Sequence, residues 1–298
     1  MRINGIVAKS IVLTILMALM STSPFVFQTL IESRENMPTS IGNLPKNIDE
    51  TDDIGRYSSL ALDSENNPHI AYYDFTNGNL VYTKYNGWEW NTTIVDSNDN
   101  VGLYASLVLD KLNNPHISYF DLVSGSLKYA HFDGVNWTNI TVDQEGVVGT
   151  HSSIAVSSNM NPHISYRDET NTNLKYAYFN GNSWTNMTLD GTLGSHNVGT
   201  FTSIDLDSGN MPHIAYYDYT GGDLEYMYND GNTWVKITAY ETQSVGQHAS
   251  LVLDSQDKPH FSFYNQNFQD LMYTHFNGTD WLVETVDSAG KVGEFSSI

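Results

Sequence analysis

The strongest constraint on the fold is an internal repeat, which recurs five times along the 298 residues. Its opening motif reads NNPHIAYYD at residues 66–74 and NNPHISYFD at 113–121. The prolines of this motif and a later tryptophan both step by 47, 47, 50 and 47 residues. These markers are Pro68, Pro115, Pro162, Pro212 and Pro259, and Trp90, Trp137, Trp184, Trp234 and Trp281. Two markers that share one spacing, including the same insertion, indicate a repeat architecture.

Each repeat contains four short runs with strand character. In the first repeat these runs are 58–63, 69–74, 79–85 and 89–96, rich in Leu, Ile, Val, Tyr and Thr with period-two alternation. Gly, Pro, Asn and Asp separate the runs, as turn chemistry requires. Four strands per repeat without a helix predict an all-β fold, a β-propeller of four-stranded blades.

The third turn of each repeat carries a second motif, with the sequences YNGWEW, FDGVNW, FNGNSW, NDGNTW and FNGTDW. This motif resembles the latter half of the Asp-box of sialidase-like propellers (BNR-type repeats), although the Ser-x-Asp opening is absent. The resemblance spans 54–290 and implies the propeller architecture. Sialidase activity would imply a cluster of arginines, whereas the repeats contain only Arg56 and Arg167. The resemblance therefore implies a non-catalytic member.

The repeats divide the chain into segments of about 47 residues. We expect five complete repeats at 54–100, 101–147, 148–197, 198–244 and 245–290, and the start of a sixth at 291–298. Either the two termini pair to close the ring, or the chain is a fragment of a six- or seven-bladed propeller. An unpaired strand edge at Ile298 favours the fragment.

The N-terminal segment reads as an export signal. Residues 11–20 are apolar and follow Arg2 and Lys9, so 1–30 is expected to be a signal peptide or a signal anchor. Residues 31–53 read as a linker with part of a closing strand. This organisation predicts an extracellular or cell-surface protein, with any membrane anchoring through the N-terminal segment only.

Composition excludes several classes of function. The chain is acidic, with 34 acidic against 13 basic residues and a net charge of −21, which disfavours nucleic acid as a partner. It contains no cysteine, so disulfides, thiol catalysis and cysteine-ligated metals are excluded. The acidity suits either solubility or a cation-binding surface.

The second residue after each Val-Gly pair, which is Ile-Gly in the first repeat, carries an aromatic or imidazole ring. On the propeller plan these residues surround the mouth of the central channel, and each is followed by a recurring serine. We expect them to bind a ligand, most naturally a sugar ring. The alternative is that the rings only pack between neighbouring blades. The candidate residues are Tyr57, Tyr104, His151, Phe201 and His248.

Two further sets of recurrent residues are of types that can bind a metal ion. The aspartates that end the second strand, Asp74, Asp121, Asp168 and Asp218, are candidate calcium ligands or caps of their own turns. The motif histidines, His69, His116, His163, His213 and His260, lie in different blades, too far apart to share an ion. We therefore predict a structural role for the histidines, bonding a loop carbonyl or carboxylate.

These observations favour a binding module for carbohydrate or a surface protein over an enzyme. No cofactor other than calcium is indicated. A glycoside hydrolase or lyase of sialidase-like architecture and a purely structural cell-surface module remain alternatives, and the enzyme question stays open. Four sequons are candidate glycosylation sites: Asn91, Asn139, Asn186 and Asn277.

Overall fold

The computed structural model describes residues 54–298 except 99, 192–195 and 243. These residues form twenty strands in five four-stranded antiparallel sheets and contain no helix. The first two sheets comprise β1 (Ile54–Leu62), β2 (Pro68–Asp74), β3 (Asn79–Tyr85) and β4 (Trp90–Asp96), then β5 (Val101–Leu109), β6 (Pro115–Asp121), β7 (Ser126–Phe132) and β8 (Trp137–Asp143).

The other three sheets repeat the same order of strands. They comprise β9 (Val148–Val156), β10 (Pro162–Asp168), β11 (Asn173–Phe179) and β12 (Trp184–Asp190); β13 (Val198–Leu206), β14 (Pro212–Asp218), β15 (Asp223–Asn229) and β16 (Trp234–Tyr240); and β17 (Val245–Leu253), β18 (Pro259–Asn265), β19 (Asp270–Phe276) and β20 (Trp281–Asp287). Each strand pairs with its sequence neighbour. The four predicted runs per repeat are thereby confirmed.

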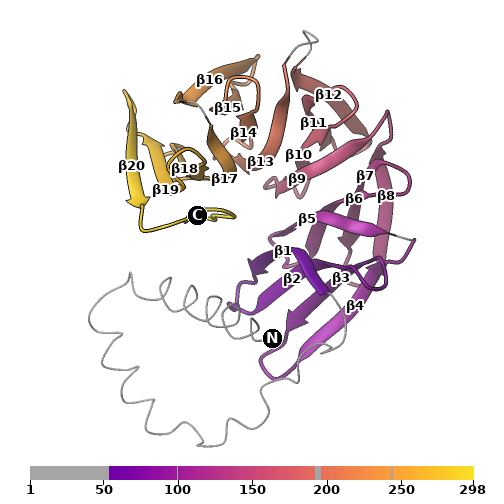
Figure 1. Ribbon diagram of the computed structural model, residues 1–298. Helices are drawn as coiled ribbons and strands as arrows, with labels where there is room; N and C mark the ends of the chain where they lie inside the picture. The colour runs from indigo at the N-terminus through magenta and orange to yellow at the C-terminus, as the bar shows by residue number, and fades with distance from the viewer. Residues whose placement is uncertain (1–53, 99, 192–195, 243) are drawn as a thin grey trace, which may run out of the picture. The chain divides into compact units, whose positions relative to one another are not determined.

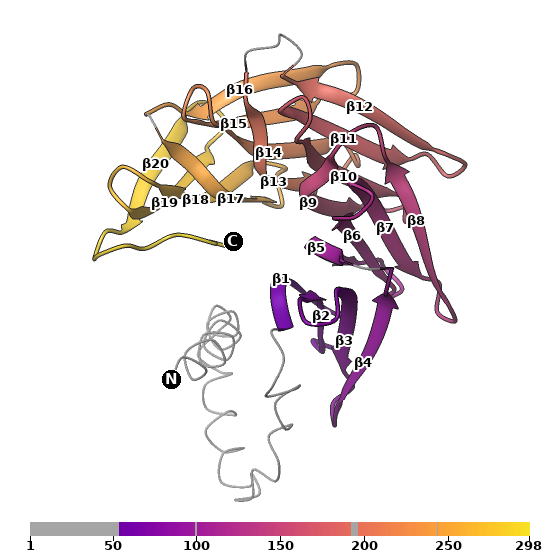
Figure 2. The ribbon, with the colours of Figure 1, turned by 45° about the vertical axis from the view of Figure 1, so that its right-hand side comes forward.

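The sheets stand around a common axis in a propeller-like arrangement (Figure 1, Figure 2). The first strands, β1, β5, β9, β13 and β17, contact one another in chain order nearest the axis. The fourth strands lie at the periphery. Within each repeat, the start of the first strand pairs with the end of the second. The beginning of each first strand and each second-to-third loop therefore lie on one face of the ring.

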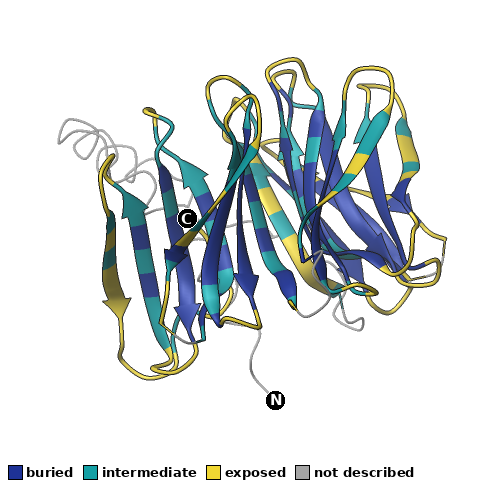
Figure 3. Ribbon diagram, turned by 90° about the horizontal axis from the view of Figure 1, so that it is seen from above, coloured by how far each residue is buried: buried dark blue, intermediate teal, exposed yellow. Residues whose placement is uncertain are grey.

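Hydrophobic side chains fill the four interfaces between successive sheets. The first interface, for example, combines Ala71 and Leu80 with Ile117 and Tyr119, all of them buried. Equivalent clusters join the second sheet to the third, the third to the fourth and the fourth to the fifth. Figure 3 shows the burial concentrated along the strands and the exposed residues in the loops. Period-two alternation is weak on the middle strands of the second, third and fourth sheets, because neighbouring sheets cover both of their faces.

The repeated tryptophan packs across these interfaces. Trp137 at the start of β8 lies 5.2 Å, between ring centroids, from Tyr82 of the preceding sheet, and Trp184 stands in the same relation to Tyr129. In the turn before each tryptophan, an Asn or Asp accepts backbone N–H groups, as Asp133 does from Val135 and Asn136. This geometry explains why an Asn/Asp-Gly turn and a tryptophan recur together.

The predicted signal or anchor at 1–30, and the linker and closing strand at 31–53, lie outside the described residues. In the part of the chain that is described, no helix is long and apolar enough to cross a membrane.

Candidate ligand-binding site

The five predicted channel residues come together and are joined by a sixth ring from the segment after β20. Successive ring centroids lie 4.6, 4.8, 4.8, 4.3 and 4.2 Å apart. We call this set the aromatic arc, made of Tyr57, Tyr104, His151, Phe201, His248 and Phe295. The rings pack against one another and still line a common cavity of about 380 Å³. The rings thus pack between neighbouring blades, as the alternative had it, and also line a cavity, and ligand binding at these residues stays a prediction.

A backbone irregularity places each ring. The first strand of each repeat carries register shifts, and its ring-bearing residue has a left-handed backbone, as in His151 with φ of 53°. The preceding glycine allows the close approach that this path needs. A Cβ on Gly149, whose φ is 109°, would stand 2.7 Å from the Cα of Leu127 in the preceding sheet. The glycine therefore permits the backbone path that positions the ring in the second to fifth repeats.

The recurring serine two residues after each ring joins neighbouring sheets. The hydroxyl of Ser59 accepts the backbone N–H of Leu107, and Ser106 accepts that of Ile154, at 2.9 and 3.2 Å. The same bond recurs from Ser153, Ser203 and Ser250. An accepting hydroxyl keeps its own hydrogen as a donor. These serines therefore have a structural role that the sequence did not reveal, and they also line the cavity.

The third repeat differs from the others in having an ion pair, Arg167–Glu169, beside the arc. Arg167 is buried and donates to Glu169 at 2.8 Å and to the side-chain oxygen of Asn197 at 2.8 Å. Glu169 also accepts the hydroxyl of Thr150 at 2.7 Å. Burial lowers the pKa of His151 to about 4, although Glu169 opposes the shift. His151 is therefore neutral at pH 7.

Burial, together with the neighbouring Tyr57, also raises the pKa of Tyr104 to about 12. At pH 7 the arc thus presents neutral rings, flanked on one side by the Arg167–Glu169 ion pair.

The four candidate calcium aspartates each hold their own turn. Asp74 accepts the backbone N–H and the side-chain amide of Asn77 at 3.1 and 2.8 Å, and Asp168 holds Asn171 in the same way. Asp121 and Asp218 likewise accept N–H groups of their loops. The turn-capping interpretation accounts for every one of these bonds, and calcium binding at these residues stays a prediction.

Four of the five motif histidines face a carboxylate, and all five also bond the hydroxyl of a tyrosine. The Nε2 of His69 faces Asp63 at 3.5 Å, and that of His260 faces Asp254 at the same distance. In all five repeats Nδ1 also bonds the hydroxyl of a tyrosine on the third strand, as in His163 with Tyr176 at 2.5 Å. The predicted carboxylate faces the histidine at 3.5–3.7 Å in four repeats, whereas the third repeat has Ser157 in its place, and the tyrosine was missed.

Three carboxylates at the ends of fourth strands were also missed, two of them buried, Asp96 and Asp143, and one partly exposed, Asp190. Asp143 accepts the hydroxyl of Tyr166 at 2.7 Å and the ammonium of Lys175 at 2.5 Å, both from the next sheet. Asp96 repeats this arrangement with Tyr119 and Lys128. Asp190 bonds Tyr216 in the same way, but its lysine, Lys236, lies on the fourth strand of the next sheet. The available signal was the Asp that ends the fourth run together with a Lys inside an otherwise apolar strand.

The four sequon asparagines are exposed. The amides of Asn139 and Asn186 donate to the carbonyls of Val95 and Val142 in the preceding sheet, at 2.7 and 2.8 Å. Asn277 accepts N–H groups of its own turn. Two of the four therefore contribute to contacts between sheets, and glycosylation stays a prediction at all four.

No protein-family profile matches this chain, and no curated protein matches it in sequence. Solved structures match its fold. The lectin of Aleuria aurantia in complex with Fucα1-6GlcNAc is 16% identical, with a TM-score of 0.53, over 79% of this chain and 79% of the lectin.

Two enzymes also match. An ulvan lyase bound to -[GlcA(1-4)Rha3S]- is 14% identical, with a TM-score of 0.50, over 78% of this chain and 69% of the lyase. A Hadza microbial sialidase is 12% identical, with a TM-score of 0.50, over 78% and 59% of the two chains. At these identities the matches show a shared fold, of the propeller-like kind found in lectins, lyases and sialidases.

Proposed function

We propose that this chain is a β-propeller of the sialidase-like, Asp-box type that binds a glycan at the aromatic arc without catalysis. The observation that carries the proposal is the arc itself, six adjoining rings around one cavity. Sugar rings present apolar C–H patches that pack on aromatic faces, and hydroxyls that need hydrogen-bond partners. The serines beside the arc supply donors, and the cavity of about 380 Å³ lies within the range of small-molecule sites.

The test is a glycan-array screen of the purified chain, followed by titration with the best glycan. Tyr104→Ala should weaken binding about tenfold or more, because truncating an aromatic hot spot typically costs ~2 kcal/mol or more. Trp88→Ala is the matched control, since Trp88 is 91% exposed in a third-to-fourth strand turn of the opposite face. Equal affinity of Tyr104→Ala and wild type would refute the arc as the binding site, provided both give the same thermal melt.

The role of calcium is tested in the same titration. We propose the loop aspartates as its ligands, because hard oxygen donors on a loop suit that ion. Affinity should then fall in EDTA and return with Ca²⁺. Affinity unchanged by EDTA would leave these aspartates as turn caps alone.

A hydrolase or lyase at the same mouth is the second candidate, favoured by the charged break in the third repeat. The neutral His151 belongs to the arc and Glu169 lies beside it, so that a carboxylate and an imidazole could exchange protons with a bound glycan. Degradation of arrayed glycans that stops in Glu169→Gln while binding persists would favour this candidate. A surface protein is the alternative partner, and a purely structural module would bind neither.

We further propose that the chain is exported and acts outside the cell or at its surface. Residues 1–30 support export, because basic residues precede an apolar stretch. Any membrane anchor is proposed for the same segment, since its apolar stretch resembles part of a membrane span. The net charge of −21 disfavours nucleic acid as a partner. Fractionation of cells that express the full chain separates a released form from a membrane-retained form.

A further inference from the structure

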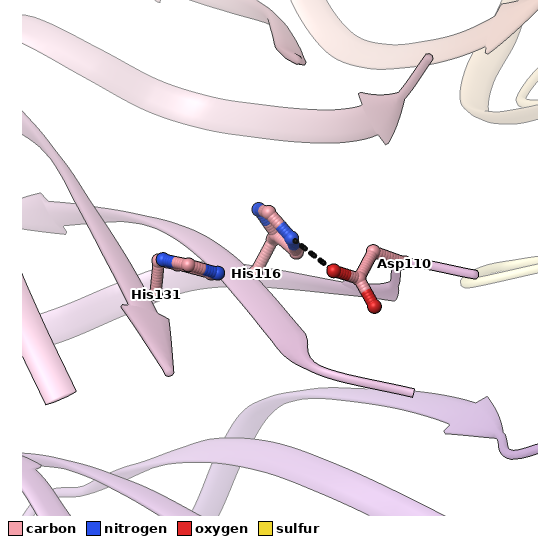
Figure 4. A group of neighbouring side chains, drawn as sticks. All are labelled: Asp110, His116 and His131. Carbon is pink, nitrogen blue, oxygen red and sulfur yellow. Dashed lines mark ion pairs between the residues drawn. The ribbon is translucent and has the colours of Figure 1, made fainter. Parts of the chain in front are cut away.

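We propose that Asp110, His116 and His131 bind a divalent transition-metal ion such as Zn²⁺, at the face of the ring opposite the aromatic arc. Asp110 follows β5, His116 lies on β6, and His131 lies directly across from His116 on β7. One ligand atom of each lies within 4.8 Å of the other two. Figure 4 shows His116 between His131 and Asp110. One imidazole pair and one carboxylate form a donor set that suits zinc and its neighbours better than calcium.

The state of His116 is the second observation that points to an ion. Its side chain is 3% exposed, and its Nε2 is buried without a hydrogen-bond partner. That nitrogen faces Oδ2 of Asp110 at 3.6 Å, which is beyond hydrogen-bonding distance. A buried nitrogen left without a partner is costly, and a cation between it and the carboxylate would satisfy both groups.

The other nitrogen of His116 is already held as a metal ligand requires. Nδ1 lies 2.6 Å from the hydroxyl of Tyr129, so an Nδ1–H can donate to this oxygen and leave the Nε2 lone pair for the ion. Asp110 is equally fixed, because its Oδ1 accepts the N–H groups of Leu112 and Asn114 at 2.8 Å each. Two of the three ligands are thus oriented by their surroundings.

The distances require only a small adjustment. A tetrahedral ion with ligands at about 2.0–2.1 Å places its ligand atoms about 3.3 Å apart. The gap between Asp110 and His116 is already 3.6 Å. The remaining movement falls to His131, which is partly exposed and whose ring centroid lies 4.4 Å from that of His116.

The site has room for an exchangeable ligand. The three side chains line a cavity of about 490 Å³ between the second and third sheets, together with Tyr129 and Trp184. A zinc site with three protein ligands keeps its fourth position for water or another small molecule.

Three of the other four repeats lack a histidine at the position of His131. The position of His131 is occupied by Lys84, Tyr178 and Tyr228 in the first, third and fourth repeats. Only the fifth repeat also has all three residue types, with Asp254, His260 and His275. There the imidazole centroids lie 5.3 Å apart, and the side chains of His260 and Asp254 are 23% and 34% exposed. The fifth repeat therefore supplies a matched control.

The experiment is isothermal titration of the untagged full chain, stripped with EDTA, with Zn²⁺ in the presence of excess Ca²⁺ and Mg²⁺. We expect one Zn²⁺ per chain, and Co²⁺ in its place should give the visible absorption of a nitrogen-ligated tetrahedral site. His131→Tyr copies the third and fourth repeats and should weaken binding by at least about tenfold. Asp110→Asn should weaken binding by a similar factor, because it removes the anionic ligand. The amide oxygen can still accept the two turn N–H groups, so the turn itself is kept.

His275→Tyr is the control, and it should leave Zn²⁺ affinity unchanged. The proposal is overturned if wild type shows no saturable binding that survives the excess Ca²⁺ and Mg²⁺, if both site variants bind Zn²⁺ as wild type does, or if His275→Tyr weakens binding equally. Thermal melts of each apo variant separate loss of the site from loss of the fold. The proposal does not depend on glycan binding, so the Zn²⁺ titration and the glycan array can fail separately.

Discussion

Asp143→Ala should lower the free energy of unfolding by about 3–5 kcal/mol, measured by denaturant titration at pH 7. Asp143 and Lys175 form a buried ion pair between the second and third sheets, with side chains 2% and 9% exposed. Burial alone would raise the pKa of Asp143, but hydrogen bonds from Lys175 and Tyr166 outweigh it and hold the pKa below its usual value. Removing the carboxylate strands a buried ammonium and a buried hydroxyl, and breaking one partner of such a pair typically has this cost.

The next interface provides the matched control. Asp190 bonds Lys236 and Tyr216, each at 2.6 Å, but Lys236 lies on β16 and also faces Glu225 at 3.4 Å, and the ionic side chains of Asp190 and Lys236 are 21% and 37% exposed. In Asp190→Ala water can solvate the exposed ammonium of Lys236. Loss of the ion pair should therefore lower the free energy of unfolding by only about 0–1 kcal/mol. Equal losses in the two variants would show that burial does not set the strength of these pairs.

A double variant separates the pair from the stranded charge. Asp143→Leu combined with Lys175→Met replaces both ions by apolar groups and should recover much of the loss, because a hydrophobic substitute for a buried pair is often close to neutral. A double variant as unstable as Asp143→Ala would mean that the bond to Tyr166, rather than the ion pair, carries the stability.

The repeat made the architecture predictable. Its prolines and tryptophans fixed the spacing, and turn residues fixed the strands, so that the first repeat was expected at 58–63, 69–74, 79–85 and 89–96. The structure gives Ile54–Leu62, Pro68–Asp74, Asn79–Tyr85 and Trp90–Asp96. The one substantial difference is the start of β1, where the glycine of the bulge and the left-handed Tyr57 masked the strand pattern.

The chemistry between sheets was less predictable, since it joins residues of different repeats. Ser106 and Asp143 reach their partners in the next sheet, and no local pattern in one repeat shows those distances. The histidines illustrate the same limit. Comparison of equivalent residues across sheets considered only an ion shared between repeats, and it could not show that His131 lies across from His116 within one sheet. That juxtaposition follows from register, which the sequence alone did not fix.

The protein should lose stability as the pH falls from 6.5 to 4, because buried histidines are held neutral in the folded state. Burial lowers the pKa of His163 to about 4 from the ordinary value of 6.5, and that of His151 equally. Between pH 6.5 and pH 4 these histidines are protonated in the unfolded chain but not in the folded protein. The stabilisation present above pH 6.5 is therefore lost progressively as the pH falls to 4. A shift of this size corresponds to at most about 3 kcal/mol per ring, an upper bound because His163 keeps some contact with solvent.

Single variants isolate this effect from the repulsion among carboxylates, which acidification relieves in a chain of net charge −21. His163 is the best choice, since its repeat has Ser157 where the other repeats have a carboxylate, and its Nδ1 bonds only Tyr176. His163→Asn should be less stable than wild type at pH 8, and the gap should shrink as the pH falls to 4. A gap that stayed constant for His163→Asn would show that its imidazole already titrates near pH 6.5 in the folded protein, and so that the pocket around Tyr176 admits water.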